Sequence, residues 1–155
     1  MVDFREGDLN FETTFDAGSG VLGIAHNAII ENAIGGSATD SIAGNSVGNT
    51  LYGGAGEGVG DLLIGGDGAD IFVCSQADAS TDLLLTDIVL DFTNGTDFIG
   101  LEDRSFSDLI FSNAAIVGAG GTQIMDISSD KKLFWLYNIE ADELDETDFI
   151  VTDFV

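Results

Sequence analysis

The residues with the clearest chemistry lie between Gly65 and Val73, where the sequence reads Gly-Gly-Asp-Gly-Ala-Asp-Ile-Phe-Val. This segment matches the nonapeptide G-G-x-G-x-D-x-U-x, a calcium-binding repeat in which U is a large apolar residue. Glycine adopts backbone conformations that a Cβ would forbid, and so leaves carbonyl oxygens free to turn inward. Calcium prefers about six to eight hard oxygens, largely carboxylates and carbonyls. The segment therefore predicts a calcium-binding turn followed by a short strand.

Degenerate copies of the repeat stand directly before it. They begin at Gly35, Gly44 and Gly53, and the third carries a three-residue insertion before Asp61. The apolar residues of the four copies are spaced nine, twelve and nine apart, at Ile42, Leu51, Leu63 and Phe72. A Gly-rich linker would not place one large apolar residue in each register. Since one copy can neither bury its apolar residue nor complete an ion's coordination shell, we expect the copies to stack.

Composition limits the classes of partner. The chain has 155 residues, of which 45% are hydrophobic, so it is long enough for a core of its own. Its 28 acidic and four basic residues give a formal charge of −24, which disfavours nucleic acid and anionic membrane surfaces. The single cysteine, Cys74, excludes an intrachain disulfide and is expected to be a small buried apolar residue. No apolar run reaches about 18 residues, so we expect no membrane insertion.

Signatures of catalysis are incomplete. Zinc peptidases hold their metal with His-Glu-x-x-His on a helix, but this chain has one histidine, His26, which we expect to be structural. The segment Gly44-Asn45-Ser46-Val47-Gly48 satisfies the hydrolase pattern G-x-S-x-G, yet it lies inside the repeat register and His26 precedes its serine. We therefore expect a non-catalytic domain, with any catalytic part, such as a zinc metalloprotease, outside this chain.

The sequence on either side of the repeats favours β structure. Asn94-Gly95 predicts a hairpin turn, residues 140–146 predict one or two helical turns, and Phe134-Trp135-Leu136-Tyr137 predicts a core strand. Other strand-like segments are expected at 2–4, 21–25, 28–30, 83–92, 98–101, 109–117, 123–127, 133–139, 149–151 and 154–155.

These flanking segments resemble the C-terminal domain of serralysin-type secreted metalloproteases. The resemblance covers Val2 to Gly7 and Ile24 to Ser37 before the repeats, and Asp87 to Phe92 and Gly95 to Ile99 after them. The ending Asp148-Phe149-Ile150-Val151 is similar to the family's acidic-then-apolar export signal. The repeats alone are shared by many RTX proteins, including lipases and alginate epimerases, so it is the flanking segments that indicate the serralysin type.

The resemblance implies an all-β fold, a parallel β-roll of RTX nonapeptide repeats flanked by the β-strands of a sandwich-like cap. It implies a single domain over 1–155, with N-terminal strands at 1–34, the roll at 35–73, and a cap with the export signal at 74–155. The function it implies is a secreted, extracellular domain that folds on binding calcium ions and serves type I secretion and the stabilisation of a secreted protein. Its partners would be calcium, the type I secretion machinery and an upstream catalytic domain.

The resemblance also implies a set of calcium ligands, drawn from one turn and from the turn two copies later on the same edge. A first site would use Gly36, Ala38 and Asp40 with Gly53, Ala55 and Glu57. A second, on the other edge, would use Asn45, Val47 and Asn49 with Gly65, Asp67 and, as a further candidate, Asp70. A third would use Gly66, Gly68 and Asp70, completed by Asp87 and, as a further candidate, Asp78. We rank the third site first and the second site last, because Asn49 carries no charge.

Two other functions remain open at this point. The same roll, as in alginate epimerases, would serve as a polysaccharide- or surface-binding module of a secreted enzyme, although the chain has few bases with which to bind an anionic polymer. The chain would also serve as a stand-alone secreted calcium-binding protein.

Overall fold

A computed structural model describes residues 31–54, 60–75, 79–102 and 104–152, together with the backbone of 2–3 and 13–14. In this part of the chain the structure consists of β-strands and short 3-10 helices, so the predicted all-β class is confirmed. None of the described helices is long and apolar enough to cross a membrane. The expected strands at 21–25, 28–30 and 154–155, and His26, lie outside the described residues.

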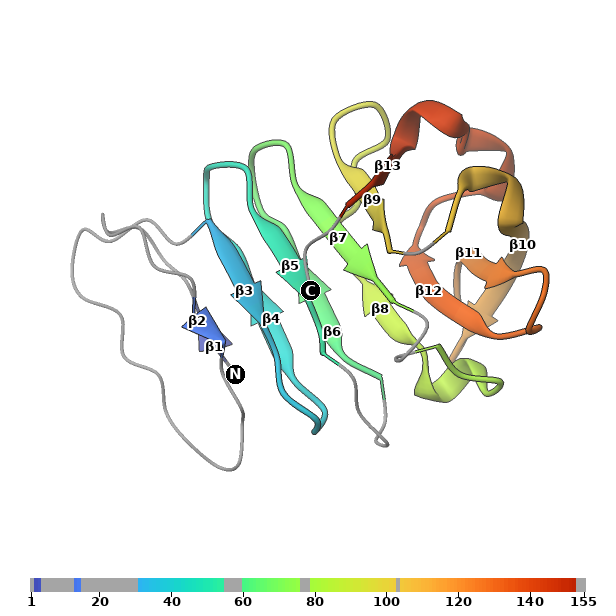
Figure 1. Cartoon of the computed structure of the whole chain (residues 1–155), viewed down its shortest axis with the longest axis horizontal. Coiled ribbons are helices and arrows are strands. Elements are labelled where there is room, and N and C mark those ends of the chain that lie inside the picture. The colour runs from blue at the N-terminus through green and yellow to red at the C-terminus, as the bar shows by residue number, and fades with distance from the viewer. Residues whose placement is uncertain are drawn as a thin grey trace.

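The strands form two sheets, which Figure 1 shows facing each other along the length of the molecule. The seven-stranded sheet contains, in spatial order, β1 (Val2–Asp3), β4 (Ser41–Ala43), β6 (Leu62–Ile64), β8 (Asp87–Val89), β12 (Lys132–Tyr137), β11 (Ala119–Asp126) and β10 (Leu109–Ile116). The six-stranded sheet contains β13 (Phe149–Val151), β9 (Phe98–Leu101), β7 (Ile71–Cys74), β5 (Thr50–Tyr52), β3 (Asn32–Ile34) and β2 (Thr13–Thr14).

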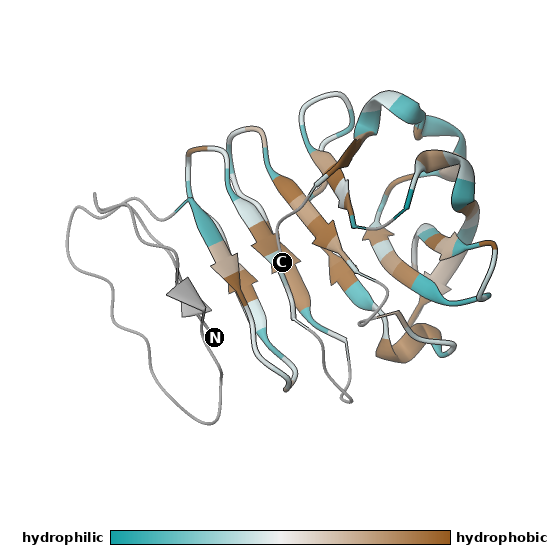
Figure 2. Ribbon diagram, viewed as in Figure 1, coloured by the Kyte–Doolittle hydropathy of each residue, from teal (hydrophilic) through white to brown (hydrophobic). Residues whose placement is uncertain are grey.

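The strands from β3 to β9 make a parallel roll, because consecutive strands alternate between the two sheets and pair in parallel with the next strand but one. Each strand turns an apolar residue into the space between the sheets, and β7 and β9 each turn in a second, Cys74 and Leu101. The first such residue of each strand is at most 3% exposed, and these residues are Ala33, Ile42, Leu51, Leu63, Phe72, Val89 and Ile99. The predicted stacking of one apolar residue per repeat is therefore confirmed, and the parallel register continues past Val73 through β8 and β9. Figure 2 shows the resulting pattern, with apolar colour along the strands and more polar colour at the turns.

The cap follows the roll and extends both of its sheets. In the six-stranded sheet, β13 pairs in parallel with β9. Strands β10, β11 and β12 are antiparallel to one another, and β12 pairs in parallel with β8. Phe134, Trp135 and Leu136 are at most 2% exposed, which confirms a core strand there. The acidic segment forms the 3-10 helices η3 (Ala141–Glu143) and η4 (Glu146–Asp148), as expected.

Two local predictions after the repeats are wrong. The segment at 83–92 is a strand only at β8, after a 3-10 helix, η1 (Leu83–Leu85). Asn94-Gly95 lies in a turn, with Gly95 at φ 75°, but this turn does not close a hairpin. It joins β8 to β9, which lie in different sheets, because Val89 and Ile99 both bury against the shared core.

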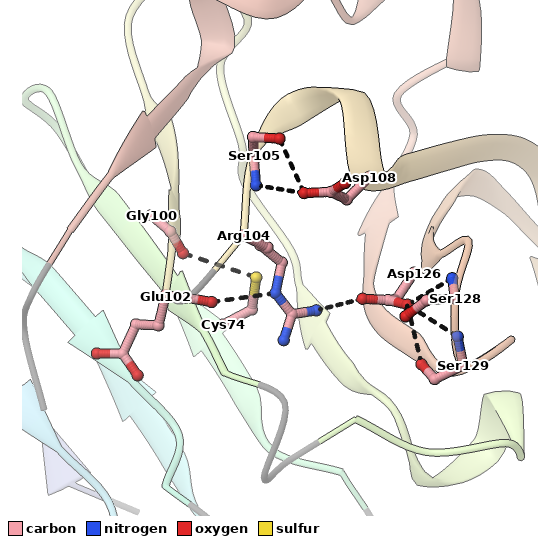
Figure 3. Close-up of polar contacts among 9 residues, drawn as sticks. All are labelled: Cys74, Gly100, Glu102, Arg104, Ser105, Asp108, Asp126, Ser128 and Ser129. Carbon is pink, nitrogen blue, oxygen red and sulfur yellow. Dashed lines mark hydrogen bonds and ion pairs between the residues drawn. The ribbon is translucent and has the colours of Figure 1, made fainter.

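A buried ion pair joins the roll to the cap (Figure 3). Arg104, which follows β9, places Nη1 3.5 Å from Oδ2 of Asp126 at the end of β11, and the two side chains are 4% and 6% exposed. The hydroxyl and backbone N–H groups of Ser128 and Ser129 donate to Oδ1 of Asp126. The hydrogen bond from the Ser128 side chain is the largest of the effects that hold the pKa of Asp126 below its ordinary value.

Cys74 is buried, as predicted, with 1% of its surface exposed. Its Sγ lies 3.6 Å from the carbonyl oxygen of Gly100.

Candidate metal centre

The turns of the roll form two rows along opposite edges, because each strand runs from one edge to the other (Figure 1). The first edge holds the connections from β3 to β4, from β5 to β6 and from β7 to β8, and the second edge holds those at 44–49, 65–70 and 90–97. Turns on the same edge therefore stack on each other, and these stacks bring the candidate ligands together.

A ladder of polar side chains runs along each edge. Its members lie two residues before the buried apolar residue of each strand, and they are Asp40, Asp61 and Asp87 on the first edge and Asn49, Asp70 and Asp97 on the second. In each ladder a backbone N–H donates to Oδ1 of the next member. The N–O distances are 2.7 Å for Asp40 to Asp61, 2.8 Å for Asp61 to Asp87, 2.8 Å for Asn49 to Asp70 and 3.0 Å for Asp70 to Asp97.

Glycine at the start of each of the four turns within the repeats makes room for oxygen atoms. A Cβ on Gly35 would lie 2.0 Å from the carbonyl oxygen of Gly53 in the stacked turn and 2.7 Å from Oδ2 of Asp40. On the second edge, a Cβ on Gly44 would lie 2.2 Å from the carbonyl oxygen of Gly65. The absence of side chains at these positions therefore leaves niches that are lined by oxygen.

Asp70 lies deepest in these ladders, with 0% of its surface exposed. Its Oδ1 accepts the hydrogen bond from Asn49, whereas its Oδ2 has no hydrogen-bond partner. Burial, and then the charges of Asp97, Asp91 and Asp67, raises the pKa of Asp70 to about 6 against the opposing effect of the Asn49 hydrogen bond. A cation beside Oδ2 would satisfy this oxygen and offset that repulsion.

The turn at 90–97 stacks on the turn that contains Asp70. Oδ1 of Asp91 accepts from Gly65 N at 2.8 Å and Oδ2 from Gly66 N at 2.9 Å. Asp97 accepts from the backbone N–H groups of Asp70 and Thr93, at 3.0 Å and 2.8 Å. Burial is the largest effect on Asp97 and raises its pKa, and the charge of Asp91 acts in the same direction.

The described residues of the first predicted site lie together on the first edge. Gly36 N donates to Oδ2 of Asp40 at 2.7 Å. The stacked turn is in close contact, since a Cβ on Gly54 would lie 2.4 Å from the carbonyl oxygen of Gly36. Ala38 lies at the exposed tip of the same turn. Ala55 and Glu57 lie outside the described residues.

The residues of the second predicted site meet on the second edge. Asn45 N donates to Oδ1 of Asn49 at 2.8 Å, and Asp67 N donates to the carbonyl oxygen of Asn45 at 3.1 Å. A Cβ on Gly68 would lie 3.0 Å from the carbonyl oxygen of Val47, so these two turns are in close contact at that point. Gly65 and Asp70 belong to the second of the two stacked turns.

The third predicted site needs a correction. Gly66, Gly68 and Asp70 share one turn on the second edge, but Asp87 stands on the first edge, where it accepts from Asp61 N. Because the chain crosses to the opposite edge with every strand, the turn nearest in sequence to Asp70 is not the turn that stacks on it. Asp78 lies outside the described residues.

The sequence prediction missed two residues of the ladders, Asp61 and Asp97, and it also missed Asp91, which binds the neighbouring turn. The repeat places its Asp at a fixed distance after its glycine pair, and the insertion after Glu57 moves Asp61 away from that position. Counting back two residues from each buried apolar residue would have found Asp61 from Leu63 and Asp97 from Ile99. Asp91 does not lie two residues before a buried apolar residue, so this count does not find it.

The arrangement fits a cation that accepts carbonyl oxygens. Among the described residues, no three Asp, Glu, His or Cys side chains gather closely enough to hold a metal ion by themselves. Any ion in the turns must therefore take backbone carbonyls as well as one or two carboxylates, as calcium does. On the second edge, Oδ2 of Asp70 would be the carboxylate ligand, and the glycine-bearing turn at 65–70 would supply carbonyls.

A comparison with protein families finds a match over almost the whole chain. Residues 6–154 match the family model described as peptidase M10 serralysin C terminal. The solution structure of a subunit of the Azotobacter vinelandii mannuronan C5-epimerase aligns with a TM-score of 0.49 and 19% identity, covering 90% of this chain and 86% of that one. No curated protein sequence matched the chain. Because the family model spans nearly the whole sequence, the chain belongs to the serralysin C-terminal family of the M10 peptidases.

Proposed function

We propose that calcium ions fill the stacked turns of this roll, that the domain folds when they bind, and that it thereby serves type I secretion and the stabilisation of a secreted protein. The observation that carries the proposal is Oδ2 of Asp70, a fully buried carboxylate oxygen with no hydrogen-bond donor and with other carboxylates nearby. A buried charge without a partner costs several kcal/mol, which a bound cation offsets.

The ligand chemistry favours calcium over other divalent ions. Zinc prefers cysteine and histidine, whereas the ladders offer only oxygen and Cys74 lies in the hydrophobic core. Magnesium requires near-ideal octahedral geometry and retains its water ligands. Calcium accepts about six to eight oxygens in a flexible arrangement, and stacked turns present carboxylate and carbonyl oxygens of this kind.

Calcium binding and folding would be coupled through charge. With a formal charge of −24, the chain repels itself when no cation is bound. In a cell with little free calcium the turns stay loose, and the chain is able to pass through an export channel. Extracellular modules bind calcium with a Kd of about 10⁻⁴ to 10⁻³ M, and binding free energy becomes folding free energy. A site at about a hundredfold over its Kd contributes about 2.7 kcal/mol, so two or three sites approach the total stability of a typical domain.

Circular dichroism tests this proposal directly. In excess chelator the spectrum should lose much of its β signal, and calcium, but not an equal amount of magnesium, should restore it. A spectrum that is unchanged by chelator would refute calcium-dependent folding. For the secretion role, the natural gene product should reach the medium through a type I exporter, and deletion of residues 149–155 should retain it in the cell. Export that is unaffected by the deletion would argue against an export signal there.

A further inference from the structure

In three turns of the roll, the ladder residue binds its own turn. Its side-chain oxygen accepts from the backbone N–H four residues earlier, which satisfies that oxygen inside the turn. The pairs and their N–O distances are Gly36 to Asp40, 2.7 Å, Asn45 to Asn49, 2.8 Å, and Thr93 to Asp97, 2.8 Å.

The turn at 65–70 departs from this pattern. The N–H four residues before Asp70 belongs to Gly66, and it donates to Oδ2 of Asp91 in the neighbouring turn, at 2.9 Å. Gly65 N donates to the other oxygen of the same carboxylate, at 2.8 Å. Oδ2 of Asp70 is therefore left without a donor, although the residue is completely buried.

We infer that Asp91 is the positioning residue of the calcium site at Asp70, because by accepting both glycine N–H groups it leaves Oδ2 of Asp70 open to the ion. The inference rests on the proposed function and names the residue that keeps Oδ2 of Asp70 without a donor. Without Asp91, the N–H of Gly66 would bind Oδ2 of Asp70, as the equivalent N–H binds the ladder residue in the three turns described above. The ion would then have to displace that hydrogen bond.

Because of the position of Asp91 in the chain, the site forms only after a later segment has packed against the repeat. Asp91 lies after β8, outside the repeat that contains Asp70, and its carboxylate reaches across 25 and 26 residues of sequence to Gly66 and Gly65. The glycine-rich repeat therefore does not complete this site alone. The site binds the ion only when the connection at 90–97 is stacked on the turn at 65–70. The last turn on the second edge therefore controls ion binding in the turn on which it stacks.

A double-mutant cycle on the full chain tests the inference. The number and affinity of bound calcium ions are measured by calorimetric titration with a competing chelator for wild type, Asp91→Ala, Asp70→Asn and the double variant. Each single variant should lower the affinity for the same ion by about tenfold or more. This is the size expected when a hydrogen bond or ligand contact to a charged carboxylate is lost. The double variant should lose no more than either single variant, because both changes act on one site.

Two further variants make the result specific. Asp142→Asn removes one exposed charge from the cap and should leave every ion unchanged, which controls for net charge. Asp91→Asn keeps one acceptor oxygen and the shape of the side chain, so it should bind the ion with intermediate affinity, and it decides the question if Asp91→Ala does not fold. Nuclear magnetic resonance of calcium-bound Asp91→Asn should show a shifted Gly66 amide.

The outcomes separate this inference from the function on which it rests. A wild-type chain that binds no calcium would refute both. A wild-type chain that binds calcium, with additive losses in the double variant or with wild-type affinity in Asp91→Asn and Asp91→Ala, would refute the role of Asp91 alone.

Discussion

The carboxyl group of Asp70 allows the metal centre to be tested without calcium. Burial and neighbouring carboxylates raise its pKa from 3.8 to about 6. Because the folded-state pKa lies above the unfolded value, the folded protein binds the proton more tightly. Stability in the absence of calcium should therefore rise as the pH falls from about 6 toward about 4. Protonation would in part replace the cation.

The magnitude follows from the size of the shift. About two pKa units correspond to about 3 kcal/mol, which the charged form of Asp70 costs the folded state at neutral pH. About 1 kcal/mol of this cost is removed between about pH 7 and pH 5, and the rest as the pH approaches the unfolded-state pKa.

Asp70→Asn removes the charge at every pH and retains an acceptor for the N–H of Asn49. Unfolding is followed by circular dichroism against urea in excess chelator, with a constant amount of osmolyte if the chelated protein is otherwise unfolded. At neutral pH the variant should be more stable than wild type by up to about 3 kcal/mol, and this advantage should shrink by about 1 kcal/mol at about pH 5. In calcium the order should reverse, because the variant lacks the anionic ligand.

Asp142→Asn is the matched control, since it relieves the net charge of −24 equally from an exposed position on η3. If wild type and Asp70→Asn have the same pH dependence in chelator, or if Asp70→Asn is the less stable of the two there, the account of this carboxylate is wrong.

Two other substitutions probe the stacked turns. Asn49→Asp adds a charge beside Asp70, so the domain should be less stable in chelator and bind calcium more tightly at the second site in calorimetry; unchanged affinity would count against that site. Gly35→Ala places a Cβ 2.0 Å from the Gly53 carbonyl oxygen, whereas Gly95→Ala meets nothing within 4 Å and carries only the cost of φ 75°, about 1–2 kcal/mol. In thermal unfolding with calcium, Gly35→Ala should lose clearly more stability than Gly95→Ala, and equal losses would contradict close stacking.

Local sequence was a good guide where a structure depends on neighbouring residues. The apolar residue of each repeat predicted the buried column that contains Leu51 and Phe72, and short strand-like segments predicted β9 and β13. The acidic stretch after Ile139 predicted helical turns. In each case the pattern lies within about ten residues, so short-range periodicity is sufficient.

Prediction failed where a structure depends on which turns stack. The hairpin at Asn94-Gly95 was wrong because the turn signal is the same for a hairpin and for a crossing between sheets. Asp87 was grouped with Asp70 because it is close in sequence, although alternate turns stand on opposite edges of the roll.

The sequence by itself determined that this chain forms short strands separated by glycine-bearing turns, with one apolar residue per strand and oxygen ligands between. Only the tertiary structure decided which oxygens share an edge. Asp70 N meets Asp97 across 27 residues and Asp61 N meets Asp87 across 26, and no local pattern encodes these distances. The physical reason is that the stacking of buried side chains between the sheets sets the register, and the register then sets which carboxylates must share a cation.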